Sequence, residues 1–329
     1  MSEFEKVATD SEARILQFSE PLSEMEVKGL ESIVFSNRPD ITLRVFGHYG
    51  QICDLSFLKN TPSVRRISAD CLENAVGIDV LAHFREIERL AIEIYSLNSF
   101  DFLKDVSPSL KELSLGKTSS KHISIESIEH FQNLTYLGLK GQRAGIEVVG
   151  KLSKLEKIVL LSISTKNLSF LEGLGRLWSV TVALGSIPEF SALTTVQNLK
   201  HLEINQVITA DDLSFISDIT PLQNLSVQSL KHVEKLPDFH NLNKLRRIYL
   251  ENLSRLVDMA SLQFAPALNE LIYVNAKNLS PEDLLPVLKN EKVRAVHCGF
   301  GSSKKNSSFL ILAQQYEKQP FHFSDFRYD

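Results

Sequence analysis

The chain repeats a short pattern of apolar and polar positions. Residues 134–139 read Leu-x-x-Leu-x-Leu, and hexads of this form occur eleven times at steps of 21 to 25 residues. The fourth and sixth residues of each hexad are apolar, the period of two expected of a strand with one buried face. The hexads begin at Val64, Ile87, Leu110, Leu134, Leu155, Leu177, Leu199, Leu222, Leu245, Leu268 and Val293.

A second set of apolar residues precedes the hexads at helical or turn spacing. Examples are Phe131, Leu171 and Leu174. A strand, a turn and a short helical return of about 22 residues cannot bury its own apolar side, whereas stacked copies share one continuous core. The sequence therefore predicts an α/β solenoid with a parallel sheet of about 12 strands, in which residues 41–45 form a degenerate earlier copy.

These hexads resemble those of leucine-rich repeat proteins, and the repeat length is similar to that of the short bacterial internalin-type and phosphatase-regulator-type repeats. The resemblance covers roughly residues 40–300. It implies a horseshoe with a parallel concave sheet, short helices or turns on the convex side, and a cap at both ends. It also implies a role in protein binding, because family members are recognition modules, inhibitors or regulators.

One feature departs from the family pattern. The Asn that bonds the backbone of the turn leaving each strand is absent, so apolar packing or main-chain contacts must replace it. The positions concerned hold Leu72, Tyr95, Thr118, Gln142, Ile163, Gly185, Val207, Leu230, Leu253 and Ala276.

Residues 1–40 break the repeat and are expected to form an N-terminal cap of a strand and a helix. Residues 14–18 can form the strand, and Ser23 followed by Glu26 is a capping-box pattern that predicts the helix. A polar-faced helix is what the exposed end of a solenoid requires. The buried face of this helix is expected to hold Met25, Leu30 and Val34.

Residues 41–298 form the repeat region, which no Pro-, Gly- or Ser-rich linker interrupts. Its longest step contains Ser280 followed by Pro281, a helix-start signal that predicts a helix in this repeat.

Residues 299–329 are expected to close the stack as a C-terminal cap. Residues 306–316 read as a capped helix, and the aromatic-rich residues 321–328 are expected to cover the last apolar layer. An aromatic segment of this kind can also serve as a partner-binding motif, and this alternative stays open.

Composition narrows the function classes. The chain has 329 residues, of which 43% are hydrophobic and 23% charged, and its formal net charge is −4. A dedicated nucleic-acid binder would show a basic excess, so no nucleic-acid partner is expected. No apolar run of about 18 residues is present, so no membrane span is expected. Three cysteines without metal spacing and a start unlike a secretory signal suit a reducing, cytoplasmic location.

Motifs for catalysis are incomplete, so the chain is expected not to be an enzyme and to need no metal or cofactor. One alternative lies at Gly299 to Lys305, which follows an expected strand and precedes an expected helix. Main-chain amides and lysines there could hold an anion. This segment lacks the third glycine of a dinucleotide motif and the Gly-Lys-Ser/Thr ending of a phosphate loop.

The outward face of the expected sheet carries the candidate binding residues. Strand geometry directs the third and fifth residues of each hexad outward, together with the residue that follows the hexad, which we number as the seventh position. Val159, Leu161 and Ala183 form an apolar patch there, and aromatic and charged residues flank it, which is the composition of a protein-binding hot spot. A long parallel sheet also carries some exposed apolar residues without any function. The predicted partner-binding residues are Arg66, Arg89, Tyr136, Lys140, Lys157, Val159, Leu161, His201, Arg247 and Tyr249.

The lone tryptophan, Trp178, occupies the variable second position of its hexad, where contact anchor and plain packing are equally compatible with the pattern. About 12 strands spaced by about 4.8 Å give a surface roughly 50 Å long, which suits a folded domain or a long peptide better than a small molecule. The sequence therefore predicts a non-catalytic scaffold that binds a protein partner through its concave face. An inhibitor or immunity-type regulator is one form of this function, and a self-associating solenoid is a further alternative.

Overall fold

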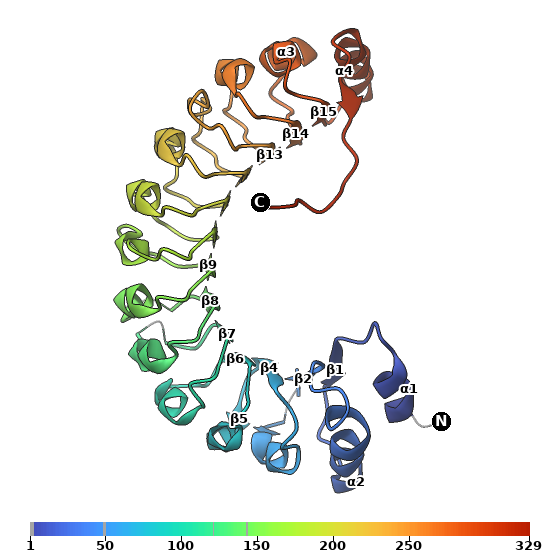
Figure 1. Cartoon of the computed structure of the whole chain (residues 1–329), viewed down its shortest axis with the longest axis vertical. Coiled ribbons are helices and arrows are strands. Elements are labelled where there is room, and N and C mark those ends of the chain that lie inside the picture. The colour runs from blue at the N-terminus through green and yellow to red at the C-terminus, as the bar shows by residue number, and fades with distance from the viewer. Residues whose placement is uncertain (1–2, 49–50, 121, 143) are drawn as a thin grey trace. The chain divides into compact units, whose positions relative to one another are not determined.

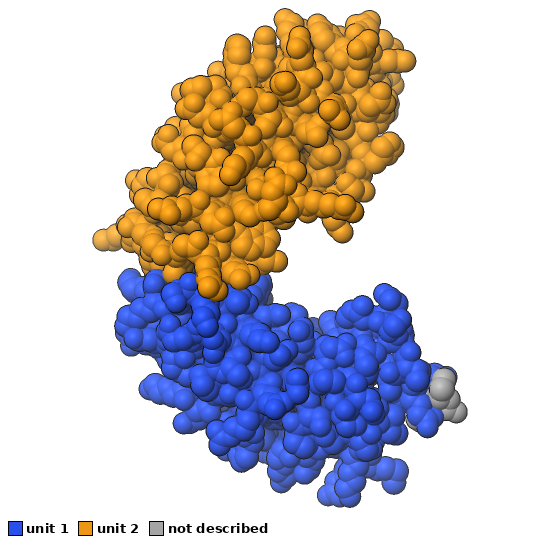
Figure 2. All heavy atoms as spheres, viewed as in Figure 1, with its two compact units in different colours: residues 1–155 blue, residues 156–329 orange. Residues whose placement is uncertain are grey.

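The computed structural model of the chain describes residues 3–48, 51–120, 122–142 and 144–329. The chain divides into two compact units, unit 1 over Met1–Leu155 and unit 2 over Glu156–Asp329 (Figure 2). Both units consist of strands that pair in parallel and short helical segments that return the chain to the next strand (Figure 1).

Unit 1 contributes six strands in the order β1-β2-β4-β6-β7-β8. A separate two-stranded sheet pairs β3 with β5. The bounds are β1 Ile15–Phe18, β2 Thr42–Phe46, β3 Cys53–Asp54, β4 Arg66–Leu72, β5 Ala75–Val76, β6 Arg89–Ile94, β7 Glu112–Leu115 and β8 Tyr136–Lys140.

Unit 2 contributes eight strands in the order β9 to β16, so the described residues form fourteen such strands rather than about twelve. The strand expected at residues 14–18 is present as β1, and β16 was not expected. The bounds are β9 Lys157–Leu161, β10 Ser179–Ala183, β11 His201–Asn205, β12 Asn224–Gln228, β13 Arg247–Glu251, β14 Glu270–Val274, β15 Ala295–Cys298 and β16 Gln319–Pro320.

The hexads give the strands their register and the units their cores. In unit 2, Leu202 lies opposite Val180 on one side and Leu225 on the other, and all three side chains are fully buried. Leu137 of unit 1 is likewise buried. Apolar fourth and sixth residues therefore stack from strand to strand, as the repeat predicted.

Short helical returns lie between the strands, most of them single 3-10 turns. The apolar residues expected to pack there, such as Phe131 and Leu171, are fully buried. The bounds are η2 Leu55–Asn60, η3 Ile78–His83, η4 Asp101–Asp105, η5 Glu126–His130, η6 Ile146–Lys151, η7 Ser169–Leu171, η8 Ser191–Thr195, η9 Ser214–Asp218, η10 Ala260–Phe264 and η11 Pro281–Leu284.

The turn that leaves each strand is built from main-chain hydrogen bonds. The second residue after the hexad adopts a left-handed conformation. Its main-chain N–H donates to the carbonyl oxygen of the last residue of the next strand. Leu184 donates to Asn205 (3.0 Å) and Gln206 to Gln228 (2.9 Å). In unit 2, main-chain contacts thus replace the family's Asn, and apolar packing, the other expected substitute, is present as well, because Ile163, Val207, Leu230, Leu253 and Ala276 are buried. The left-handed residues of unit 2 are Ser162, Leu184, Gln206, Ser229, Asn252 and Asn275.

The N-terminal residues contain α1 (Glu3–Thr9), α2 (Glu24–Gly29) and the π-helical η1 (Leu30–Phe35). Ser23 caps α2 with the expected capping box.

The expected buried face of this helix was wrong at one residue. Leu30 and Val34 are buried, but Met25 is 83% exposed. Five residues at about 100° each place Met25 about 140° around the helix from Leu30. Val27, three residues before Leu30, takes the buried position instead.

The last repeat contains the helix expected after Ser280, as η11 followed by α3 (Leu285–Lys289). Helix α4 (Ser303–Gln315) begins three residues before the expected start, because Ser302 acts as its N-cap and accepts a hydrogen bond from the main-chain N–H of Lys305 (3.4 Å). Within the described part of the chain, no helix has the length and apolar character needed to cross a membrane.

Candidate functional site

Each unit has a sheet face directed away from its core, which we call the open face. Strand β11 illustrates the alternation. Leu202 and Ile204 are buried in the core, whereas His201, Glu203 and Asn205 lie on the open face and are partly exposed. The open face therefore carries the variable positions of the repeat, where the candidate binding residues were predicted.

Residues 321–329, which we call the tail segment, cross the open face of unit 2. After β16 the chain runs back over the strands that precede it (Figure 1). The expectation that this segment covers the last apolar layer is correct only for its first residue, Phe321, which is buried. Tyr328 instead contacts Trp178, immediately before β10. The variable second and third hexad positions provide a polar and aromatic track that the aromatic segment follows.

Tyr328 is held by aromatic and polar groups from three repeats. Its ring centroid lies 4.9 Å from that of Trp178 and 6.1 Å from that of His201. Asn224 donates a hydrogen bond to its hydroxyl oxygen (3.1 Å). The ammonium nitrogen of Lys157 lies over the Trp178 ring, 4.7 Å from its centroid. Trp178 is therefore a contact anchor for the tail segment.

Burial changes the proton affinities at this end of the site. Burial and, to a smaller extent, the positive charge of Lys157 lower the pKa of His201 from 6.5 to about 4. The Nδ1 atom of His201 is buried without a hydrogen-bond partner. Burial also raises the pKa of the Tyr328 phenol. The imidazole is therefore neutral at pH 7 while the tail segment covers it.

Arg247 is the central contact of the tail segment, and its side chain is only 12% exposed. One guanidinium nitrogen donates to the main-chain oxygen of Ser324 (3.0 Å), and Nε donates to the carboxylate of Glu270 (2.6 Å). The guanidinium carbon lies 5.1 Å from the ring centroid of Phe321 and 5.2 Å from that of Phe326. Arg247, a predicted binding residue, thus joins the sheet to two aromatic side chains and to the backbone of the segment.

The preceding residue, Arg246, also binds the segment. It donates to the main-chain oxygen of Arg327 (2.8 Å) and lies 3.2 Å from the Asp329 carboxylate. The main-chain N–H of Asp329 donates to the side-chain oxygen of Gln223 (3.1 Å), and Lys200 donates to the main-chain oxygen of Asp329. Several of these hydrogen bonds are therefore made with the backbone of an extended peptide rather than with its side chains.

These contacts use the second and third hexad positions of β10 to β13. Farther along the strands, at the fifth and seventh positions, the open face of unit 2 carries its own polar network. Gln228 donates to Glu203 (3.2 Å) and Ser226 (2.9 Å), and Tyr249 donates to Glu251 (2.7 Å). Burial and the bond to Glu251 raise the pKa of Tyr249 to about 12, and burial raises the pKa of Glu203.

The predicted apolar patch lies on β9 and β10. Leu161 is directly opposite Ala183 in register, and Val159 is opposite Thr181. Val159 and Leu161 are partly exposed, whereas Ala183 is buried. The structure therefore brings Leu161 and Ala183 together. Ile272, at an outward position of β14, is also buried, and its neighbour in register, His297, contacts Phe323 of the tail segment.

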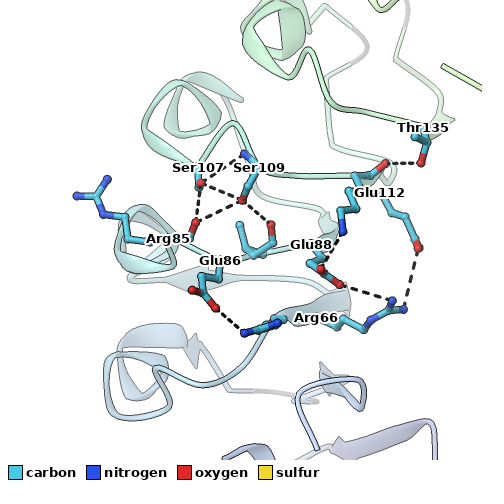
Figure 3. A network of polar contacts seen from close by, with 11 residues as sticks. Arg66, Arg85, Glu86, Glu88, Ser107, Ser109, Glu112 and Thr135 are labelled. Carbon is cyan, nitrogen blue, oxygen red and sulfur yellow. Dashed lines mark hydrogen bonds and ion pairs between the residues drawn. The ribbon is translucent and has the colours of Figure 1, made fainter. Parts of the chain in front are cut away.

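The open face of unit 1 is organised by ion pairs instead (Figure 3). The guanidinium of Arg66 lies 3.9 Å from Glu88 and 4.0 Å from Glu112, and that of Arg89 lies 3.5 Å from Glu112. Lys140 bonds Glu93 (2.6 Å). Three of the cationic residues predicted to bind a partner are thus paired with carboxylates of their own unit.

Tyr136 occupies the space that small residues leave on this face. A side chain at Gly138 would meet the hydroxyl oxygen of Tyr136 at 3.3 Å and that of Ser114 at 3.1 Å. The hydroxyl of Tyr136 therefore lies over Gly138, and the Tyr136 side chain is partly exposed.

The alternative anion site uses its polar groups internally. Lys305 donates to the main-chain oxygen of Leu279 (2.7 Å), and the side chain of Asn306 accepts the N–H of Phe300 (2.9 Å). With Ser302 capping α4, these groups hold the helix against the last repeats. Lys304 alone among the candidate cations is exposed.

Reactive chemistry is sparse in the part of the chain that the structure describes. No group of three or more His, Cys, Asp or Glu side chains there is arranged to hold a metal ion. Burial raises the pKa of Cys53 to about 11 and raises that of Cys298 further. Both thiols are therefore protonated near neutral pH, and a thiol in that state is a poor nucleophile.

Sequence reasoning missed five residues that touch the tail segment, namely Lys200, Gln223, Asn224, Arg246 and His297. The first four occupy the second or third position of a hexad. The signal was the second-position column, in which Trp178, Lys200, Gln223 and Arg246 follow one another in consecutive repeats. These residue types bind aromatic rings, backbone oxygens and carboxylates, and no carboxylate interrupts these four consecutive positions.

No protein-family model matches the chain, and no curated protein sequence is significantly similar to it. Solved structures are similar in fold. An internalin (InlF) of Listeria monocytogenes aligns with a TM-score of 0.57 at 19% identity, over 85% of this chain and 77% of that chain. The functional domain of InlJ from the same organism aligns with a TM-score of 0.52 at 13% identity, over 85% and 65%.

The structure of the mouse RP105/MD-1 complex contains a further similar chain, with a TM-score of 0.59 at 15% identity over 92% of this chain and 58% of that one. Such neighbours are leucine-rich repeat proteins. Together with the parallel sheet and the repeated hexads, they show that this chain has the leucine-rich repeat fold.

Proposed function

We propose that the chain is a non-catalytic scaffold that binds a protein partner through the open face of its sheet. The observation that carries this proposal is the tail segment itself. The open face of unit 2 holds an extended peptide along β10 to β15 through aromatic rings, guanidinium groups and hydrogen bonds to the peptide backbone. A surface able to bind one such peptide has the chemistry required to bind another.

The composition of this surface supports the proposal. Trp, Tyr and Arg side chains dominate the energetics of protein interfaces, and both Trp178 and Arg247 contact the tail segment. The similar structure of RP105 is that of a complex with the protein MD-1, an example of this fold engaged with a protein. A role as an inhibitor or immunity-type regulator is a narrower form of the same proposal, as is a cytoplasmic location.

The residues proposed to contact the partner remain those predicted from the sequence. Those of unit 2 are stronger candidates than those of unit 1. Arg66, Arg89 and Lys140 are already paired with carboxylates. Unit 2 provides the stronger candidates, which are Lys157, Val159, Leu161, His201, Arg247 and Tyr249.

The test is an affinity pull-down from native lysate read by mass spectrometry. Wild type is compared with a double variant that carries Leu161→Asp and Tyr249→Ala. Circular dichroism checks that both proteins are folded. Matched substitutions away from the open face, Val257→Asp and Tyr95→Ala, serve as the control because both side chains are exposed. A protein enriched by wild type and control but lost by the open-face variant is expected. Equal enrichment by all three would contradict binding through this surface.

A further inference from the structure

The tail segment has the features of a bound ligand, although it belongs to the same chain. It has no regular secondary structure beyond β16. It contacts the open face through Phe321, Phe323, Phe326, Tyr328 and Asp329, while the exposed side chains of His322 and Asp325 lie between these contacts. Solvent-facing side chains thus separate contacting ones, as in peptides that lie along a protein surface.

The charges of the two surfaces are complementary. Lys157, Lys200, Arg246 and Arg247 belong to unit 2 and line the path; Arg246 is paired with the carboxylate of Asp329, and Arg247 with that of Glu270. Lys200 bonds the main-chain oxygen of Asp329. The far end of the path is therefore a cationic site that receives an aromatic side chain followed by an acidic residue.

The groups beneath the segment include polar atoms that it leaves without a partner. The Nδ1 atom of His201 and the Nε atom of Arg246 are buried without hydrogen bonds. Both belong to residues that contact the segment, through Tyr328 and Phe326 respectively. The surface therefore offers donors or acceptors that another peptide could use and that the chain's own segment does not satisfy.

We propose that residues 321–329 are an intramolecular ligand, and that the partner bound by unit 2 presents an extended segment of the same chemistry, Phe-x-Tyr-Asp or a similar aromatic pair followed by a carboxylate, which displaces them. This inference rests on the proposed function and gives it a ligand pattern and a means of regulation. An intramolecular ligand acts at a high effective concentration, commonly in the millimolar range. A partner must therefore exceed the affinity of the tail segment, which restricts binding to partners that match the whole pattern.

The experiment uses the full chain and a fluorescein-labelled synthetic peptide with the sequence of residues 319–329, followed by fluorescence polarisation. Three proteins are compared: wild type, a tail variant with Phe326→Ala and Tyr328→Ala, and a control with His322→Ala and Asp325→Ala. The tail variant is expected to bind the peptide at least about tenfold more tightly than wild type, because its own segment no longer competes. The control is expected to behave as wild type does.

Arg247→Ala, added to the tail variant, is expected to weaken peptide binding by about tenfold or more, since it removes contacts to the backbone and to two rings. A peptide with both aromatic residues of the Phe-x-Tyr pair changed to Ala is expected not to bind. Equal affinity of wild type and tail variant for the peptide, or binding by neither, would overturn the inference. A wild-type mass of two chains that falls to one in the tail variant would also overturn it, in favour of a segment exchanged between two copies.

The experiments distinguish failure of the proposed scaffold function from failure of the intramolecular-ligand inference. If the pull-down enriches a partner that the peptide does not compete away, the ligand pattern is wrong while the scaffold function stands. If the peptide binds the tail variant but no open-face-dependent partner is enriched by either protein, the scaffold function is contradicted while the intramolecular contact stands.

Discussion

The open faces of unit 1 and unit 2 share one backbone arrangement but differ in the groups that their arginine side chains contact. In unit 1, Arg66 and Arg89 lie against Glu112 of the same face. In unit 2, Arg246 and Arg247 lie against a segment that is about 80 residues distant in sequence. In unit 1 these arginines lie near carboxylates of the same face, whereas in unit 2 Arg247 bonds both Glu270 of its own face and the backbone of the tail segment.

The difference shows which charged residues indicate a binding surface. The third-position column of unit 1 contains Arg89 and Glu112 in direct register, so opposite charges meet within the sheet. Exposed pairs of this kind are worth little energetically and leave little attraction for a partner. An aromatic residue followed in the next repeat by a cation at the same hexad position, as at Trp178 and Lys200, is the better indicator.

The largest expected effect concerns what the two units have in common. Leu137 of unit 1 and Leu202 of unit 2 are fully buried at equivalent hexad positions. Replacing either with Ala is expected to cost about 2–5 kcal/mol of unfolding free energy, because each substitution leaves a cavity in a packed core. Chemical denaturation of the two variants measures this cost.

Gly138→Ser is the control for the register of unit 1. Its new side chain would approach Ser114 and Tyr136, both of which can rotate, so its cost is expected to be smaller than that of Leu137→Ala. Equal or reversed costs would show that the assignment of buried and open faces is wrong.

Acid is expected to release the tail segment from unit 2. Burial, to which the contact with Tyr328 contributes, and secondarily the charge of Lys157 lower the pKa of His201 from its ordinary value of 6.5 to about 4. The neutral imidazole therefore contributes docking free energy that is fully present above pH 6.5 and is lost as the pH falls towards 4. The loss amounts to at most about 3 kcal/mol. Emission of Trp178, measured between pH 7.5 and 4, reports the release.

Other charged and titratable groups act on the same equilibrium. Lys157 disfavours protonation of His201, and Glu203, whose pKa burial raises, titrates with the opposite sign. His201→Gln isolates the histidine, because its side chain keeps a polar group but does not titrate. An acid transition of unchanged size and midpoint in this variant would contradict the assignment to His201.

Two arginines of unit 2 sharpen the comparison further. Arg247→Ala is expected to weaken docking of the tail segment by about 1.5–3 kcal/mol, the range for hydrogen bonds to charged groups. The change in Trp178 emission measures it. Arg255→Ala is the matched control, because its side chain is 59% exposed and lies at 3.9 Å from Glu234. Equal emission changes in the two variants would contradict a specific role for Arg247.

The smallest effect is expected on the open face of unit 1. Arg66→Ala removes two ion pairs at 3.9 and 4.0 Å between partly exposed side chains. We expect a cost of about 0–1 kcal/mol that shrinks with added salt. Denaturation at low and high salt measures it. A cost as large as that of Leu137→Ala would show that these pairs are central to the stability of unit 1.

The sequence predicted the strands and the core because both follow from local periodicity. The hexad at residues 199–204 places Leu202 and Ile204 in the core, and the structure confirms this placement. Capping signals at Ser23 and Ser280 were equally local and are confirmed. Met25 was wrong because the choice of a helix face depends on small angular offsets that a few apolar residues do not define.

The path of the tail segment could not be predicted by the same means. Its aromatic residues indicate that Phe326 and Tyr328 seek cover, but nothing in their local pattern identifies which surface provides it. The contacts connect Tyr328 to Trp178, 150 residues earlier. Only the arrangement of consecutive repeats brings Trp178, Asn224 and Arg247 onto one face, so the site exists only after the strands have stacked.

Acrylamide quenching of Trp178 tests the central claim most directly, since this is the only tryptophan of the chain and it contacts Tyr328. Wild type is compared with Tyr328→Ala and with Tyr95→Ala, a matched change at an exposed tyrosine of unit 1. The docked segment predicts stronger quenching in Tyr328→Ala and unchanged quenching in Tyr95→Ala. Identical quenching of all three proteins would contradict a tail segment bound to the open face of unit 2.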